Sequence, residues 1–192
     1  FWSVPRFRLG QRLPRTPELV IAALGPRMLR LAGEVADGVL LNYLPATHVG
    51  WSVDHVREGE RRAGRPPGSC TVYAYVHVGV CDREQAAEKA RRDLFSYAVV
   101  DAYADSFRTA GFGAEVDELR ARHRERDRAG AIAAVSDVMV DAIDICGDAA
   151  TVRDAIGQYR AAGVDHPILM PLPWGDDRWA VVDATLEAGR NV

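Results

Sequence analysis

The sequence has few cysteines and almost no lysine. The three cysteines, Cys70, Cys81 and Cys146, lie far apart and form no C-x-x-C or Cys/His cluster. We therefore expect no structural zinc site and no disulfide scaffold, and each cysteine is best interpreted as a small buried residue. Lys89 is the only lysine among 24 basic residues. This skew indicates a GC-rich genome rather than an arginine-dependent binding site.

No excess of positive charge and no long apolar run is present. Lys and Arg total 24 against 27 Asp and Glu, and the formal net charge is −3. Such a chain offers no basic field for a phosphate backbone, so we expect no nucleic-acid partner. No window approaches the roughly 18 apolar residues of a membrane span. Residues 1–6 show neither a signal-peptide pattern nor an initiator methionine. The sequence predicts a cytoplasmic protein without a membrane partner, in a chain that was cut or begins upstream.

The remaining composition is that of a globular protein. Hydrophobic residues make up 48% and charged residues 27% of the 192 positions, which favours one domain and at most two. Residues 1–17 contain Pro5, Pro14 and Pro17 among scattered arginines, and they predict a surface arm or connecting loop. Residues 18–192 then form the folded part of the chain.

Apolar runs and turn residues predict a first strand–helix–strand unit over residues 18–42. The run 18–24 is apolar after Glu18, as in a strand buried on both faces. Gly25 and Pro26 follow, and proline at the first helical position loses no hydrogen bond. We expect Gly38 to close this helix in the left-handed conformation and a second strand to occupy 39–42. Loops this short are typical of a parallel crossover.

The β–α pattern continues to give four units with one enlarged crossover. Helix-like residues 48–63 precede a long strand at 71–80, which is rich in β-branched and aromatic residues. Residues 82–146 show no strand signal and predict helices only, with a break at 111–113 and two short helices at 131–135 and 137–145. A helix capped by Asp148, a strand at 167–171 and a last helix at 177–188 complete the chain.

Four β–α units fit either an open doubly wound sheet or part of an eight-stranded barrel. The residues themselves favour the barrel. Residues 20–42, VIAALGPRMLRLAGEVADGVLLN, closely resemble the segment that marks the luciferase-like monooxygenase superfamily. The resemblance is nearest to the branch that uses the deazaflavin coenzyme F420, which includes methylenetetrahydromethanopterin reductase-like enzymes. Residues 134–148 and 159–165 resemble the late-helix and last-strand region of the same family.

The resemblance implies an α/β fold in which this chain is the C-terminal half, strands 5–8, of a TIM (β/α)8 barrel. Residues 18–192 would form this partial barrel, with a helical insertion at about 82–146. A complete barrel typically needs about 250 residues, so four strands cannot close one. We therefore expect the missing N-terminal half as a partner. The open strand edges also predict a homo-oligomer.

The resemblance also implies an oxidoreductase activity. The expected reaction is hydride transfer between coenzyme F420 and an organic small-molecule substrate. Two alternatives stay open, namely an FMN-dependent monooxygenase of the same fold and a non-catalytic half barrel. In this family the coenzyme carries the hydride, and the proton-handling residues come mostly from the early strands. We therefore assign no catalytic residue, and no metal ligand set emerges from the sequence.

The expected coenzyme site is the loop of Ala22, Ala23, Leu24, Gly25 and Pro26. A strand here runs into a helix N-terminus, whose free N–H groups point outward with the positive end of the helix dipole. Small residues let a phosphate approach the backbone, and the resemblance implies that this loop holds the coenzyme's phosphate or ring edge. The alternative is a tight turn in which small residues simply fit.

Asn42 ends the next strand at the same edge, where the active sites of this fold lie. It is expected to bind coenzyme or substrate, unless it only satisfies its own turn.

Other polar and aromatic residues near strand ends have two interpretations each. His48 either caps its helix or contacts substrate. His77 either faces a pocket or is a core histidine bonded to a neighbour. Met170, Pro171 and Trp174 either wall a flat ring or pack in the core.

Overall fold

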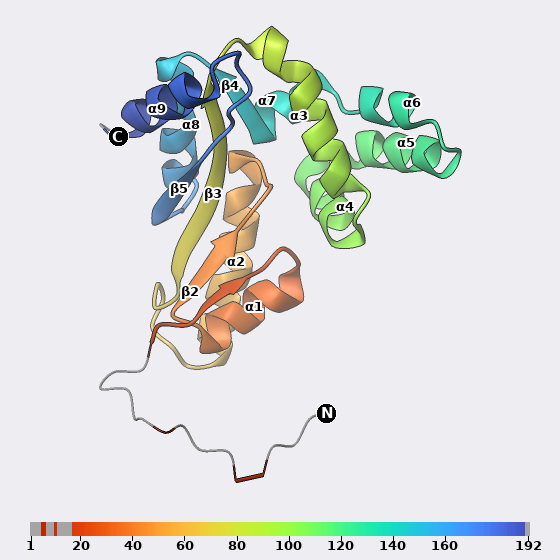
Figure 1. The fold of residues 1–192 in the computed structure, drawn as a ribbon. Helices are drawn as coiled ribbons and strands as arrows, with labels where there is room; N and C mark the ends of the chain where they lie inside the picture. The colour runs from red at the N-terminus through yellow and green to blue at the C-terminus, as the bar shows by residue number, and fades with distance from the viewer. Residues whose placement is uncertain (1–4, 7–9, 11–16, 191–192) are drawn as a thin grey trace.

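The computed structural model describes residues 5, 6, 10 and 17–190, so the arm expected at 1–17 lies almost entirely outside the described residues. The five strands of the described part are β1 (Val20–Ala22), β2 (Gly38–Leu41), β3 (Thr71–Val80), β4 (Asp144–Gly147) and β5 (His166–Pro171). The helices are α1 (Pro26–Val35), α2 (Ala46–Arg62), α3 (Arg83–Ala98), α4 (Asp101–Phe107), α5 (Gly113–Arg124), α6 (Arg128–Ala133), α7 (Asp137–Ile143), α8 (Ala149–Ala161) and α9 (Arg178–Gly189), with a π-helical turn η1 (Arg108–Phe112) between α4 and α5 (Figure 1).

The strands form one parallel sheet, as the sequence predicts. Val20 pairs with Gly38, which sets β1 parallel to β2. The first half of β3 pairs with β2, and residues 73–78 of β3 pair with β5 on the other edge. The four predicted strands therefore lie side by side in chain order, β1, β2, β3 and β5. An α/β fold with parallel strands is confirmed.

One strand was not expected. The prediction that residues 82–146 contain helices only is wrong, because Asp144–Gly147 form β4. This strand pairs with residues 77–80 of β3. It lies on the same edge of β3 as β2, which pairs with residues 71–74. The helix predicted over 137–145 accordingly ends at Ile143. The strand is defined by its partner, since four residues after a short helix carry little periodicity of their own.

Helices cover one face of the sheet. Alternate residues of β3, Val72, Ala74, Val76 and Val78, are fully buried in a core that also contains side chains of α1, α2, α8 and α9. The intervening residues, such as Tyr73 and Tyr75, are only half-buried. Since successive strand residues point to opposite faces, the sheet has one dry face and one face that is partly open.

Two glycines let α1 and α2 touch through their backbones. A Cβ on Gly33 would fall inside contact distance of the Val56 carbonyl oxygen. One on Gly59 would meet the Arg30 carbonyl oxygen in the same way. The first β–α–β unit and the helix after it are therefore joined at their closest possible spacing.

Gly38 has a different role from the predicted one. It is the first residue of β2 and lies outside the left-handed region, so the expectation that it closes α1 is wrong. A Cβ at Gly38 would lie 2.8 Å from Cε2 of Tyr73 on the neighbouring strand. The absence of a side chain at Gly38 therefore leaves room for the Tyr73 ring. Gly64 (φ 66°) after α2 and Gly163 (φ 110°) after α8 do adopt the left-handed conformation.

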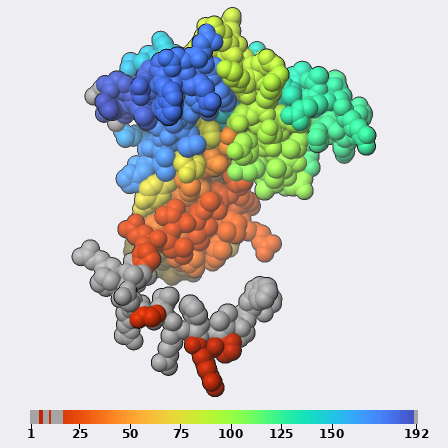
Figure 2. Space-filling model, in the orientation of Figure 1, coloured from red at the N-terminus to blue at the C-terminus, as the bar shows by residue number. Residues whose placement is uncertain are grey.

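Helices α3 to α7 form a separate layer beside the sheet (Figure 1). They share an apolar core with Tyr43, which follows β2. In the space-filling view these helices project from the upper part of the molecule (Figure 2). The predicted break at 111–113 is confirmed, since Gly111 has φ 105°.

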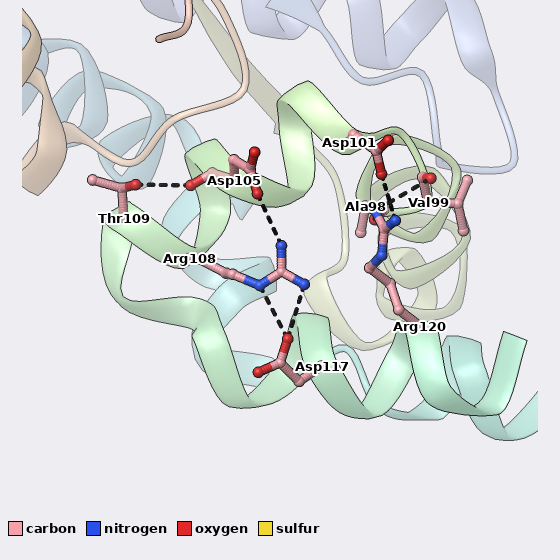
Figure 3. A network of polar contacts seen from close by, with 8 residues as sticks. All are labelled: Ala98, Val99, Asp101, Asp105, Arg108, Thr109, Asp117 and Arg120. Carbon is pink, nitrogen blue, oxygen red and sulfur yellow. Dashed lines mark hydrogen bonds and ion pairs between the residues drawn. The ribbon is translucent and has the colours of Figure 1, made fainter. Parts of the chain in front are cut away.

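Arginines tie this helical layer together on its outside (Figure 3). Arg108 donates from Nη1 to Asp105 and from Nη2 to Asp117, at 3.0 and 2.9 Å. Arg120 donates to Asp101 and to backbone carbonyls at the end of α3. Helix α5, which contains Asp117 and Arg120, is thus held at the surface to α4 by ion pairs and to the end of α3 by hydrogen bonds. Within the described ranges, no helix combines the length and the apolar character needed to cross a membrane.

Candidate functional site

A small recess lies where β1 and β2 end. Ala23, Leu24 and Asn42 line it together, and α4 contributes Ser106. Its remaining lining residues are Leu41, Leu44 and Ser52. The recess is too narrow to admit a water molecule, whereas typical ligand pockets have a volume of roughly 300–1,000 Å³. The structure thus brings the predicted loop and Asn42 together around a recess that is too small to enclose a coenzyme ring.

The loop from Ala22 to Pro26 has the geometry of an open helix N-terminus. Gly25 is the N-cap residue with extended backbone (φ −93°, ψ 159°), and Pro26 is the first helical residue. No side chain caps the first turn of α1. Gly25 is exposed, and a Cβ built on it meets nothing within 4 Å. The amides of this turn therefore face open space, which is the arrangement that binds anions at helix N-termini.

Asn42 is held by two neighbours. Its Oδ1 lies 2.9 Å from His77 Nε2, and its Nδ2 donates to the Tyr103 hydroxyl at 3.5 Å. His77 is 5% exposed and lies against the Tyr43 ring, with ring centroids 4.1 Å apart. Burial lowers the pKa of His77 to about 4. His77 is therefore a neutral buried histidine bonded to a neighbour, which agrees with the core interpretation.

Two carboxyl groups complete the cluster at this end of the sheet. The Tyr43 hydroxyl donates to Oδ2 of Asp93 on α3 at 2.7 Å. Asp144, the first residue of β4, is completely buried, and neither of its carboxyl oxygens has a hydrogen-bond partner. Its Oδ1 lies 3.8 Å from His77 Nδ1. Burial raises the pKa of Asp144 well above its ordinary value, and the nearby Asp93 carboxyl raises it further.

The sequence analysis missed both carboxyl groups. Asp93 lies in a predicted helix with many charged residues, and Asp144 lies in a segment predicted to be helical. One signal was present, because Asp144 is flanked directly by Ile143 and Ile145. A single charge inside an apolar run is a mark of a buried carboxyl group.

The other candidate residues, His48, Trp174 and Met170, lie outside the recess. His48 does not cap its helix, because Pro45 is the N-cap residue and His48 lies in the first turn of α2. Its ring is buried and stacks on Trp51 with centroids 4.6 Å apart. Trp174 packs against the cluster around Cys146 and Leu172. Met170 remains 39% exposed on the sheet.

A wider depression lies elsewhere, in the segment 173–182 after β5. It is lined by side chains such as Trp179, which is 78% exposed. Because its walls are mostly exposed residues from one short stretch of the chain, we place the site at the ends of β1 and β2 instead. The described part of the chain holds no group of three or more His, Cys, Asp or Glu side chains that could bind a metal ion.

Comparison with known proteins agrees with this geometry. The family model described as luciferase-like monooxygenase matches residues 1–166. The chain is 29% identical over 164 residues to 5,10-methylenetetrahydromethanopterin reductase of Methanopyrus kandleri, covering 85% of this chain and 47% of the reductase. It is 32% identical over 161 residues to the enzyme of that name from Methanolobus tindarius, covering 76% and 45%.

The solved structure of the coenzyme F420-dependent tetrahydromethanopterin reductase from Methanopyrus kandleri is similar with a TM-score of 0.68 and 27% identity. The match covers 91% of this chain and 50% of that one. The chain thus spans about half the length of the curated relatives it matches. These relatives are enzymes, and the matched family model covers most of the chain. The chain belongs to the luciferase-like monooxygenase family.

Proposed function

We propose that this chain is part of a coenzyme F420-dependent oxidoreductase that transfers a hydride between the deazaflavin and an organic substrate. The observation that carries the proposal is the uncapped N-terminus of α1, which opens at the end of β1 beside Asn42. Support comes from relatives named as reductases, one of which is named as coenzyme F420-dependent. The four strands β1, β2, β3 and β5 would be strands 5–8 of a TIM barrel, with α3–α7 as an insertion.

The residues present fit an anionic coenzyme. Ala22 and Ala23 keep the loop small, and Gly25 leaves open space in front of the first-turn amides. These amides would bind a phosphate through the backbone, while Leu24 and Asn42 border the ring or the substrate. When bound, the coenzyme supplies the hydride. The chain's own contribution is to bind and orient.

The described strands and loops do not by themselves enclose a substrate. The recess is small, and the sheet face beside it is partly open at Tyr73 and Tyr75. We infer that the N-terminal half of the barrel, with its own loops, covers this face and encloses the substrate. A homo-oligomer would add to that cover at the strand edges.

The loop is tested by adding a side chain where the phosphate would lie. Gly25→Val fills the space in front of the amides, yet its φ is ordinary and its Cβ meets nothing within 4 Å, so the fold should be kept. Gly50→Val is the matched control, because Gly50 also has open space but lies in α2, well inside the helix. Both variants are made with the N-terminal half of the barrel present, and F420 is titrated into each.

We expect Gly25→Val to weaken F420 binding by about tenfold to a hundredfold, since a good charged hydrogen bond contributes about 1.5–3 kcal/mol. Gly50→Val should bind like the wild type. Equal dissociation constants for the wild type and a folded Gly25→Val variant would remove this loop from the coenzyme site.

Oxygen consumption and coenzyme binding distinguish the proposed function from two alternatives. An FMN-dependent monooxygenase of this fold would consume oxygen when FMN and a reductant are added, whereas a deazaflavin enzyme would not. A half barrel with no catalytic role would bind neither coenzyme even with the other half present.

A further inference from the structure

The cluster at the ends of β2, β3 and β4 contains one polar group whose bonding is incomplete. Asp144 is 0% exposed, and both of its oxygens lack a donor. The group that faces it, the Asp93 carboxyl, offers only acceptors unless a proton is added. Two ionised carboxylates in contact and out of water repel each other strongly. The geometry therefore requires a proton between them.

The surroundings show which member of the pair carries the charge. Asp93 accepts the Tyr43 hydroxyl at 2.7 Å and is half-buried, so a negative charge there has a donor and some contact with water. Asp144 has neither. The proton consequently resides on Asp144, and the charge on Asp93.

The tautomer of His77 follows from its two neighbours. Its Nε2 lies 2.9 Å from Asn42 Oδ1, and an amide oxygen only accepts, so Nε2 carries the proton. In the neutral ring Nδ1 is then a bare acceptor, 3.8 Å from Asp144 Oδ1. An Asp144 whose proton lies toward Asp93 is neutral and places no negative charge beside this bare Nδ1, which suits this tautomer.

We propose that Asp93 and Asp144 hold one shared proton, and that this acid pair, acting through His77, fixes which end of the Asn42 amide faces the recess. Asp144 is a positioning residue in this arrangement. Any effect of Asn42 on coenzyme binding rests on the proposed function, whereas the shared proton does not.

Loss of the proton would reverse the hydrogen bonds of His77 and Asn42. An ionised Asp144 places a negative charge 3.8 Å from His77 Nδ1, which favours the tautomer with hydrogen on Nδ1. Nε2 then becomes an acceptor and cannot bond Asn42 Oδ1. The amide flips, its Nδ2 donates to His77, and its Oδ1 accepts from the Tyr103 hydroxyl. The side chain of Asn42 thereby exchanges a donor for an acceptor at the edge of the recess.

The titratable groups that face Asp144 are few. They come from α3 (Asp93), β3 (His77), the segment after β2 (Tyr43), α8 (Tyr159) and β4 itself (Cys146). The acidic residues of α7, Asp137 and Asp141, instead pair with Arg83 at the surface. Asp93 is therefore the group with which Asp144 shares its proton.

The first experiment needs no coenzyme. Infrared spectra of the full chain at pH 7 should show a protonated carboxyl band that is absent in Asp144→Asn and kept in Asp183→Asn, which changes an exposed carboxyl on α9. Nitrogen-15 NMR should show His77 neutral with hydrogen on Nε2. A wild type without the acid band and with a His77 imidazolium would overturn the proposal in favour of an Asp144–His77 ion pair.

The second experiment tests the link to Asn42. With the N-terminal half present, F420 affinity is measured against pH. The wild type should lose affinity by about tenfold as the pair gives up its proton, the value of one hydrogen bond, while Asp144→Asn should show no such step. A step of equal size in both proteins would overturn the positioning role. Absence of any F420 binding would refute the proposed function and leave the infrared result to decide the shared proton.

Discussion

At the scale of single residues, two buried carboxyl groups are held in opposite ways. Glu60 on α2 is completely buried but accepts from the amides of Cys70 and Gly68 at 2.7 and 3.0 Å and from Arg57 at 2.7 Å. Burial acts to raise its pKa, yet these donors outweigh burial and the pKa is lowered. Asp144 has burial without donors, and its pKa is raised. Equal burial thus gives a charged group in one place and a protonated one in the other.

This contrast predicts opposite effects of neutral amides on stability. The lowered pKa of Glu60 means that its stabilisation is present above the unfolded pKa and is lost as pH falls through the folded value. Glu60→Gln should therefore destabilise the fold at pH 7 by about 3 kcal/mol, the scale of a broken buried ion pair. The deficit should shrink at acid pH. Urea unfolding at several pH values measures it.

For Asp144 the sign is reversed. Its raised pKa means that the folded state binds a proton more tightly than the unfolded chain, so stability declines as pH rises from the unfolded pKa through the folded value. Asp144→Asn should match the wild type near pH 4 and become relatively more stable at alkaline pH. A variant that loses stability at alkaline pH would show that the ionised form is the native one.

At the scale of elements, the contact of α1 with α2 is the most sensitive to added volume. Gly33→Ala places a methyl group against the Val56 carbonyl and should cost about 1–3 kcal/mol through overpacking. Gly50→Ala, in the same helix as Val56, has open space and should stabilise by about 0.5–1 kcal/mol, because alanine favours helix. Thermal melts of both variants test the pair, and equal effects would contradict the close approach.

The elements also show what the sequence could and could not predict. The strand–helix–strand unit at 20–41 was predicted because an apolar run, a Gly-Pro turn and a second apolar run follow one another with short loops. Asp148 was predicted as a cap and does accept from the third amide of α8, as Asp82 does from the third amide of α3. Short-range patterns of this kind are local, so the sequence contains them.

Features that depend on distant partners were missed. Strand β4 exists because residues 77–80 of β3 offer it an edge, 67 residues earlier for Asp144 and His77. Gly38 is constrained by the Tyr73 ring rather than by its own helix. The candidate loop and Asn42 were placed at one edge by the β–α pattern, but the acid pair behind Asn42 joins residues from α3 and β4 that no spacing connects.

At the scale of the whole molecule, the sheet is covered on one side and open at its ends. Among the described strands β1 pairs only with β2, and β5 only with β3. Val20 is 44% and Met170 39% exposed on these outer strands. Such edges and apolar side chains favour pairing with another chain.

The chain expressed by itself should therefore sediment as an oligomer or unfold at low temperature. Adding the N-terminal half of the barrel should give a discrete complex with a higher melting temperature. Analytical ultracentrifugation and calorimetry measure both. A monomer that melts cooperatively at high temperature would contradict the half-barrel arrangement.

On one edge, β3 pairs with two different strands along its length, and this arrangement has a consequence for local unfolding. Its first residues are bound to β2, its last to β4, and Tyr75 and Val76 have a partner only in β5. The first part of β3 is joined through β2 to α1, and the last part is joined through β4 to α3 and α7 of the helical layer. Hydrogen exchange should accordingly resolve two cooperative units that meet within a single strand. A helical layer that exchanges separately would uncover the strand ends while the β1–β2 edge stays protected.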